Sequence, residues 1–184
     1  MNKLTIAVIA ASNRPGRLSI NAAKLVFAVA QANPEIKAIF IDRDEFEFQK
    51  DGSNEDLRIA KYSELTAQAD GFFIVTPEYN HSYPSSLKRM LDSEYDNYLH
   101  KPVALAGVSS GPWGGVRALE GLLPTLRALG LVPLQHDLQF PQVQDTFSAQ
   151  GELLDQKYRE RIEKILNELV WLTKTLKWGR ENLK

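Results

Sequence analysis

The chain has 184 residues, of which 43% are hydrophobic and 24% charged, so its composition is that of a folded protein with one full-sized core and not of a disordered chain. Its 22 Lys and Arg residues nearly balance its 23 Asp and Glu residues, and the net charge of −1 argues against a nucleic-acid-binding surface. Because the sequence has no cysteine, disulfides, thiolate catalysis and thiolate-bound metals are excluded.

The first apolar run, residues 4–10, is predicted to be a buried strand and not a secretory signal. The run is short and is followed at once by Arg14 and Arg17, which does not suit the apolar part of a signal peptide. No apolar run in the sequence approaches the roughly 20 residues that a membrane span needs. We therefore expect a cytoplasmic protein.

Apolar runs alternate with segments of helical periodicity along the chain. Strands are predicted at residues 4–10, 36–41, 71–75, 102–108 and 131–134. Helices are predicted at about residues 20–31, 55–69, 85–92, 116–129 and 151–178, with Ser19 as the cap of the first and residues 135–150 left irregular. The polar loop 42–54 contains Phe46 and Phe48, which either form an exposed lid or subunit contact or tuck into the core.

This alternation of strands and helices, without internal repeats, predicts a single α/β domain over residues 1–184. The expected fold is a doubly wound, five-stranded parallel sheet in the order 2-1-3-4-5, with helices on both faces and a long C-terminal helix at about residues 151–178. In this order the loops after strands one, three and four meet at the carboxyl edge of the sheet, where such folds bind ligands.

The loop after strand one predicts a phosphate site. It offers the hydroxyls of Ser12 and Ser19, two arginines and the free N–H groups at the start of the next helix. Arg14 lies further forward in the loop than Arg17 and is expected to be the closer of the two to a phosphate. The alternative is a solvated basic turn. Because the loop is poor in glycine and lacks a terminal lysine, it is neither a dinucleotide fingerprint nor a P-loop.

The loop after strand three predicts a wall for a flat ring. Tyr79 can lie against such a ring and Asn80 can both donate and accept hydrogen bonds. Pro77 and Pro84 stiffen the backbone, so its N–H groups can point at a ligand with little loss of entropy. The alternative is a rigid turn with Tyr79 packed inward. His81 could act as a general acid, although a single histidine on a loop is more often incidental.

The loop after strand four, residues 109–115, is rich in glycine and surrounds Trp113. Glycines let a ligand approach the backbone closely, and the two serines of the loop could donate to a ring carbonyl or a hydroxyl. Trp113 either shields a ring or plugs the core beneath a tight turn. Arg117, early in the next helix, either reaches the phosphate of a second ligand or faces water.

Together the three loops supply a phosphate end, a flat-ring wall and a backbone-lined floor, which are the features that flavin mononucleotide (FMN) requires. The sequence has neither a cluster with metal-ligand spacing nor a nucleophile elbow. We therefore expect no metal and no catalytic side chain, because the cofactor would carry the chemistry.

At these residues the sequence resembles the NADPH-dependent FMN reductase family, which has a flavodoxin-like fold and includes quinone, azo-dye and chromate reductases. The family motif G-S-x-R-x-G-S-x-N is matched by Ala11-Ser12-Asn13-Arg14-Pro15-Gly16 and Ser19-Ile20-Asn21, with Arg17-Leu18 inserted and Ala11 in place of a glycine. The motif P-E-Y-N-x-S-x-P-x-x-L-K matches residues 77–88, and the motif S-x-G-x-x-G-G-x-R-A matches residues 109–118.

The resemblance implies which residues bind FMN. The residues implied at the phosphate are Ser12, Arg14, Ser19, Ile20 and Asn21. Those implied along the isoalloxazine ring and ribityl chain are Pro77, Glu78, Tyr79 and Asn80, with Ser110, Gly111 and Gly115 completing the pocket.

The resemblance also implies an FMN-dependent NAD(P)H oxidoreductase. The nicotinamide would pass a hydride to the flavin, which would give two electrons to a quinone, an azo compound or a similar acceptor. Backbone N–H groups near Asn80 and Gly111 would stabilise the reduced ring. A homodimer or dimer of dimers is expected through the helix at residues 85–92, with neither nucleic acid nor membrane as a partner.

Two alternatives stay open. One is a flavin-binding electron carrier or regulatory module without turnover, and the other is a nucleotide-binding α/β protein without flavin. The sequence also leaves open the physiological electron acceptor and the preference for NADPH or NADH.

Overall fold

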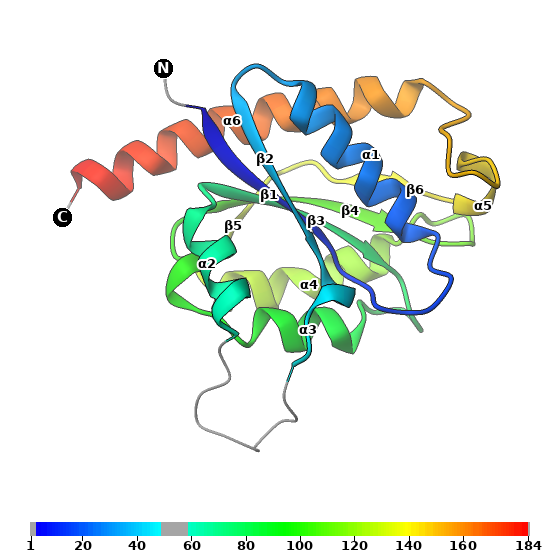
Figure 1. The fold of residues 1–184 in the computed structure, drawn as a ribbon, viewed down its shortest axis with the longest axis horizontal. Coiled ribbons are helices and arrows are strands. Elements are labelled where there is room, and N and C mark those ends of the chain that lie inside the picture. Colours follow the sequence, from blue (N-terminus) through cyan, green and yellow to red (C-terminus); the bar gives the residue numbers. More distant parts are fainter. Residues whose placement is uncertain (1–2, 49–58, 184) are drawn as a thin grey trace.

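A six-stranded parallel sheet forms the centre of the structure, a computed structural model that describes residues 3–48 and 59–183 (Figure 1). Its strands are β1 (Leu4–Ala10), β2 (Ile36–Asp42), β3 (Gly71–Pro77), β4 (Pro102–Val108), β5 (Val132–Pro133) and β6 (Leu138–Phe140). They follow the order β2-β1-β3-β4-β5, and β6 pairs with β4. The predicted fold class and strand order are thereby confirmed. Every residue of β3 and β4 is buried, as expected of apolar runs covered on both faces.

The outer part of the sheet differs from the prediction. The fifth strand is only Val132–Pro133, which pairs with the start of β4, whereas β6 pairs with the end of β4. The last bond of this part is donated by the N–H of Leu134 to the carbonyl of Val103 at 3.0 Å, after which the chain leaves the sheet and returns at Leu138. The prediction of an irregular segment at residues 135–150 is therefore wrong, since this segment contains β6 and the short helix α5 (Val143–Thr146).

Helices cover both faces of the sheet. On one face lie α1 (Ser19–Ala32) and α6 (Lys157–Asn182), and on the other lie α2 (Ala60–Gln68), α3 (Ser85–Leu91) and α4 (Val116–Ala128) (Figure 1). The single-turn helix η1 (Arg43–Glu45) follows β2, and η2 (Asp96–Tyr98) precedes β4. Each helix buries residues at spacings of three or four, as Leu119, Leu122 and Leu126 do in α4. The buried side chains form one apolar cluster on each face of the sheet.

Some helix boundaries differ from those predicted. The last helix begins at Lys157 and not near residue 151, because the preceding segment turns back on itself: Gly151 has a φ of +82° and Phe147 bridges to Leu153. Residues 55–58, the predicted start of the second helix, lie outside the described residues, within which α2 begins at Ala60. Among the described helices, none combines the length and the apolar character needed to cross a membrane.

The two loop phenylalanines pack into the core. Phe46 is only 5% exposed, and its ring centroid lies 5.7 Å from that of Tyr62 and 6.2 Å from that of Phe48. The prediction of an exposed Phe46 is wrong, and the alternative that it tucks into the core is confirmed. The rest of that loop, residues 49–54, lies outside the described residues.

Candidate functional site

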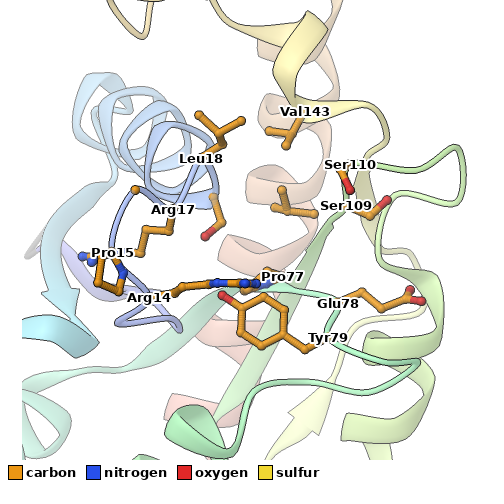
Figure 2. A pocket seen from close by; sticks show the side chains of 13 residues that line it. Arg14, Pro15, Arg17, Leu18, Pro77, Glu78, Tyr79, Ser109, Ser110 and Val143 are labelled. Carbon is orange, nitrogen blue, oxygen red and sulfur yellow. The ribbon is translucent and has the colours of Figure 1, made fainter.

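A cavity of about 280 Å³ opens at the carboxyl edge of the sheet (Figure 2). It is lined by residues 14–19 between β1 and the start of α1, by residues 77–79 and 108–110 at the ends of β3 and β4 and just beyond them, and by Val143 of α5. The three loops predicted to meet at this edge do so, because parallel strands in this order bring their carboxyl ends together.

The two arginines of the first loop have different partners. Arg17 donates to Asp42 at 2.6 Å and to Asp44 at 3.0 Å, so one carboxylate at the end of β2 and one in η1 balance its charge. Arg14 forms no ion pair with the described residues, and its guanidinium carbon lies 5.3 Å from the centroid of the Tyr79 ring. The charge of Arg14 is therefore not balanced by a carboxylate among the described residues, whereas that of Arg17 is. That Arg14 is the closer of the two to a phosphate stays a prediction.

Ser12 and Tyr79 join the first loop to the second. Their hydroxyl oxygens lie 2.8 Å apart, and the backbone N–H of Arg14 donates to Ser12 Oγ at 3.2 Å. Ser12 is buried and does not line the cavity, whereas Tyr79 does. The hydroxyl of Ser12 thus holds the ring that forms one wall of the cavity.

The second loop is a tight hairpin turn. Tyr79 and Ser82 exchange backbone hydrogen bonds of 2.8 and 3.0 Å. The two residues between them, Asn80 and His81, have φ values of 49° and 67°, which is the pattern of a type I′ turn. Both are exposed at the tip of the turn and neither lines the cavity. Pro84 follows at the N-cap of α3.

The third loop is held against β4 by glycines. A Cβ atom on Gly115, which has a φ of +84°, would lie 2.5 Å from the backbone nitrogen of Val108. Gly111 has open space where a Cβ would stand. Trp113 is 64% exposed, so the alternative that it plugs the core is wrong. The backbone N–H of Val143 donates to the carbonyl of Ser109 at 3.0 Å, which attaches α5 to the rim of the cavity.

Glu78 and Arg117 form an ion pair beside the cavity. Glu78 Oε1 accepts from Arg117 Nε at 2.8 Å. The Glu78 side chain is only 7% exposed and lines the cavity, whereas the Arg117 side chain is 44% exposed. The second carboxylate oxygen, Oε2, is buried without a hydrogen-bond partner. Arg117 therefore pairs through Nε with a buried carboxylate of the cavity wall, and part of its guanidinium faces solvent.

The cavity brings together about half of the residues predicted to bind FMN. Those that line it are Arg14, Ser19, Pro77, Glu78, Tyr79 and Ser110. Those outside its lining are Ser12, Ile20, Asn21, Asn80, Gly111 and Gly115. Asn21 instead approaches Gly151, where a Cβ atom would lie 3.1 Å from Asn21 Oδ1. All of these ligand contacts stay predictions.

Ser19 lies in the cavity wall and does not cap α1. It is the first residue of the helix, Leu18 occupies the N-cap position, and no side chain caps the helix end. Leu18 and Val143 also line the cavity, and the sequence analysis missed both. Val143 lies in the segment predicted to be irregular, so no sequence pattern linked it to the site. The described residues contain no group of His, Cys, Asp or Glu that could hold a metal ion.

Residues 4–145 match the sequence model of the NADPH-dependent FMN reductase family. An NAD(P)H-dependent FMN reductase of Pseudomonas aeruginosa is 35% identical over 120 residues, which is 62% of this chain and 65% of that protein. A quinone reductase of Escherichia coli is 30% identical over 163 residues, 84% of this chain and 87% of that protein. The solved structure of FerB, a flavoenzyme NAD(P)H:(acceptor) oxidoreductase of Paracoccus denitrificans, superposes with a TM-score of 0.73 at 22% identity, covering 94% of this chain and 98% of that one.

Proposed function

Since the chain belongs to the NADPH-dependent FMN reductase family, we propose that it is an FMN-binding NAD(P)H oxidoreductase that reduces quinones, azo compounds or similar small-molecule acceptors. The observation that carries the proposal is the cavity at the carboxyl edge, where all three family motifs contribute residues. A flavin at this edge agrees with the ligand position of doubly wound sheets.

The residues of the cavity fit FMN in charge and shape. Arg14 lacks a carboxylate partner among the described residues and can meet a phosphate, and Ser19 adds a hydroxyl to the same cavity. Tyr79 supplies a flat face, and Ser110 supplies polar groups on the opposite side. The volume of about 280 Å³ is slightly below that of typical ligand pockets, which span roughly 300–1,000 Å³. The cavity would thus enclose part of the cofactor and leave a face open to substrates.

Bound FMN would accept a hydride from NAD(P)H and pass electrons to the acceptor. The protein's task is to bind and orient it. Ser12 fixes the Tyr79 ring through its hydroxyl, and Asp42 and Asp44 fix Arg17 within the first loop. The rigid hairpin after β3 and the glycine contacts after β4 hold backbone N–H groups in place before the cofactor binds, which lowers the entropic cost of binding.

We also propose a cytoplasmic homodimer or dimer of dimers. The contact with the second copy is expected through α3, the helix that the resemblance to the family places at a subunit interface. Phe46, now found in the core, gives no support to this proposal. Light scattering at micromolar concentration should give at least twice the chain mass of 20.7 kDa, and a mass near 20.7 kDa would refute it.

The first test is a visible spectrum of the purified protein, loaded with FMN, before and after anaerobic addition of NADPH. We expect oxidised flavin bands that bleach on addition, followed by recovery when a quinone is supplied. A matched binding measurement uses the quenching of FMN fluorescence, with Arg14→Gln as the test variant and Arg127→Gln as the control. Arg127 is an exposed arginine of α4 outside the cavity. We expect about tenfold weaker FMN binding for Arg14→Gln alone.

Flavin bands that persist with NADPH would favour an electron carrier or regulatory module. A protein that stays colourless after incubation with FMN would refute the flavin site. Failure of the FMN-loaded protein to oxidise NADPH with any of oxygen, quinone, ferricyanide or azo dye would refute the proposed reductase.

A further inference from the structure

Arginines lie on two sides of the cavity, and they differ in their ion-pair and hydrogen-bond partners. On the side of the first loop, Arg17 is paired with two carboxylates and Arg14 lies over the Tyr79 ring. On the other side, Arg117 is not itself a lining residue, but it bonds to Glu78, which is. Figure 2 shows the Glu78 carboxylate directed away from Arg14 and Arg17. A phosphate held by the first loop would leave the cation at the opposite side free for a different ligand.

The bond to Glu78 orients Arg117 but occupies only one of the three nitrogen atoms of its guanidinium. Only Nε donates to Glu78, and among the described residues neither terminal nitrogen of the guanidinium has a hydrogen-bond partner. Because the Glu78 side chain is 7% exposed, its position is set by the cavity wall, and that of Arg117 follows. An arginine anchored through Nε presents its two terminal nitrogens as a fork, a geometry that matches phosphate oxygens.

The position of Arg117 in the chain adds to its attraction for anions. It is the second residue of α4, a helix of 13 residues whose first N–H groups carry a partial positive charge. The loop that leads into this helix is held against β4 by close glycine contacts, so the helix end cannot easily drift from the cavity. The buried negative charge of Glu78 is compensated by Arg117, which leaves the helix end as an additional positive contribution.

We propose that Arg117, positioned by Glu78, binds a phosphate group of the nicotinamide dinucleotide that donates the hydride. The inference rests on the proposed function and identifies a residue that determines donor affinity in that same site. The dinucleotide carries a diphosphate, and NADPH carries a further phosphate on the 2′ oxygen of its adenosine ribose. Arg117 recognises one of these groups, while Arg14 serves the phosphate of FMN.

The test compares Arg117→Gln and Arg117→Lys with Arg127→Gln, all saturated with FMN. Arg127→Gln removes the same charge from the same helix, at an exposed position outside the cavity. The dissociation constants of NADP⁺ and NAD⁺ are measured by calorimetry, and the KM for NADPH is measured with a neutral quinone as acceptor. The dissociation constant of FMN is measured separately by fluorescence.

We expect Arg117→Gln to weaken NADP⁺ binding and raise the KM for NADPH about tenfold, with kcat and FMN affinity changed less than about twofold. Arg117→Lys keeps the charge beside Glu78 but loses the fork, so we expect a loss of about threefold. Arg127→Gln should bind like the wild type. A loss confined to NADP⁺ assigns Arg117 to the 2′-phosphate, and an equal loss for NAD⁺ assigns it to the diphosphate.

Equal NADP⁺ affinities for Arg117→Gln and Arg127→Gln would overturn the inference while leaving the proposed reductase intact. A change restricted to the KM of an anionic acceptor, such as a sulfonated azo dye, would also overturn it, because Arg117 would then serve the acceptor. Arg117→Gln could fail to fold because Glu78 is left unpaired in the cavity wall. In that case the NADP⁺ affinity of Arg117→Lys, compared with that of the wild type, tests the inference. A wild-type protein that binds no FMN would refute the proposed function itself, and the fluorescence titration detects that case independently.

Discussion

At the level of single residues, two tyrosine hydroxyl groups bond to each other in the apolar cluster on the face of the sheet that α2 covers. Tyr62 of α2 and Tyr98 of η2 are both fully buried, and their hydroxyl oxygens lie 2.6 Å apart. Burial raises the pKa of both phenols far above the ordinary value of 10.0, so both stay neutral at any physiological pH. The pair links Phe46, which packs on Tyr62, to Phe72 of β3, which packs on Tyr98. It therefore supports the strand that leads into the cavity.

Removing one hydroxyl of this pair should cost more than removing both. In Tyr62→Phe, the buried hydroxyl of Tyr98 loses its partner, and we expect a loss of about 1–3 kcal/mol in the free energy of unfolding. In the double variant Tyr62→Phe/Tyr98→Phe, no polar group is left unsatisfied, so most of that loss should be recovered. Urea denaturation of the four proteins of this cycle measures the effect. Additive losses would show that the hydroxyls act independently.

At the level of elements, the connection from β4 to α4 depends on contact between backbones. Gly107 in β4 faces Gly114 and Gly115 in the loop, and a Cβ on Gly107 would lie 2.5 Å from the carbonyl oxygen of Gly114. Gly115 also adopts a φ of +84°, which side chains with a Cβ atom disfavour. This contact sets the distance between the start of α4, which carries Arg117, and the cavity wall.

A methyl group at Gly115 should therefore push the loop away from the strand. We expect Gly115→Ala to lower the free energy of unfolding by about 2–4 kcal/mol, because both the positive φ and the contact with Val108 oppose it. Thermal and urea denaturation measure the loss.

Gly111→Ala is the matched control within the same loop. A Cβ at Gly111 meets open space, so we expect a change in stability within about 0.5 kcal/mol. Its FMN affinity is informative separately: weaker binding is expected if the cofactor approaches the Gly111 backbone closely. A Gly115→Ala variant as stable as Gly111→Ala would contradict this account of the loop.

At the level of the whole molecule, one acidic residue should make the stability depend on pH. Asp137 lies just before β6, and burial raises its pKa from the ordinary 3.8 to about 6, with a further increase from Glu120 and a decrease from His136. The folded protein therefore holds this proton more tightly than the unfolded chain. The resulting stabilisation is complete below about pH 4 and is lost as the pH rises through about 6.

Asp137→Asn should remove this dependence. At pH 7.5 we expect the variant to be more stable than the wild type by about 1 kcal/mol, a value reduced for solvent screening because the carboxyl is only partly buried. Near pH 3.5, where the wild-type carboxyl is largely protonated, the two proteins should be about equally stable. Denaturant unfolding at both pH values provides the measurement. An equal gain at both values would mean that packing, and not ionisation, is responsible.

The sequence by itself determined the type and order of most elements and the loops that carry the site. Continuous apolar runs are sufficient to predict β1, β3 and β4, because a strand buried on both faces needs no polar alternation. The family motifs lie at the ends of these strands. With the order 2-1-3-4-5, chain topology alone then brings their loops to one edge of the sheet.

Only the tertiary structure decided which polar groups pair and which surfaces are covered. The bond between Arg17 and Asp42 joins residues 25 positions apart, and that between Glu78 and Arg117 joins residues 39 positions apart, so no local pattern encodes either. The burial of Phe46 depends on Tyr62 of α2, and β6 depends on pairing with the end of β4, beyond the start of β4 that pairs with β5. The apolar periodicity of a segment predicts which of its sides faces the core, but not which individual residues it contacts. Charge balance and desolvation depend on neighbours that only the folded chain brings together.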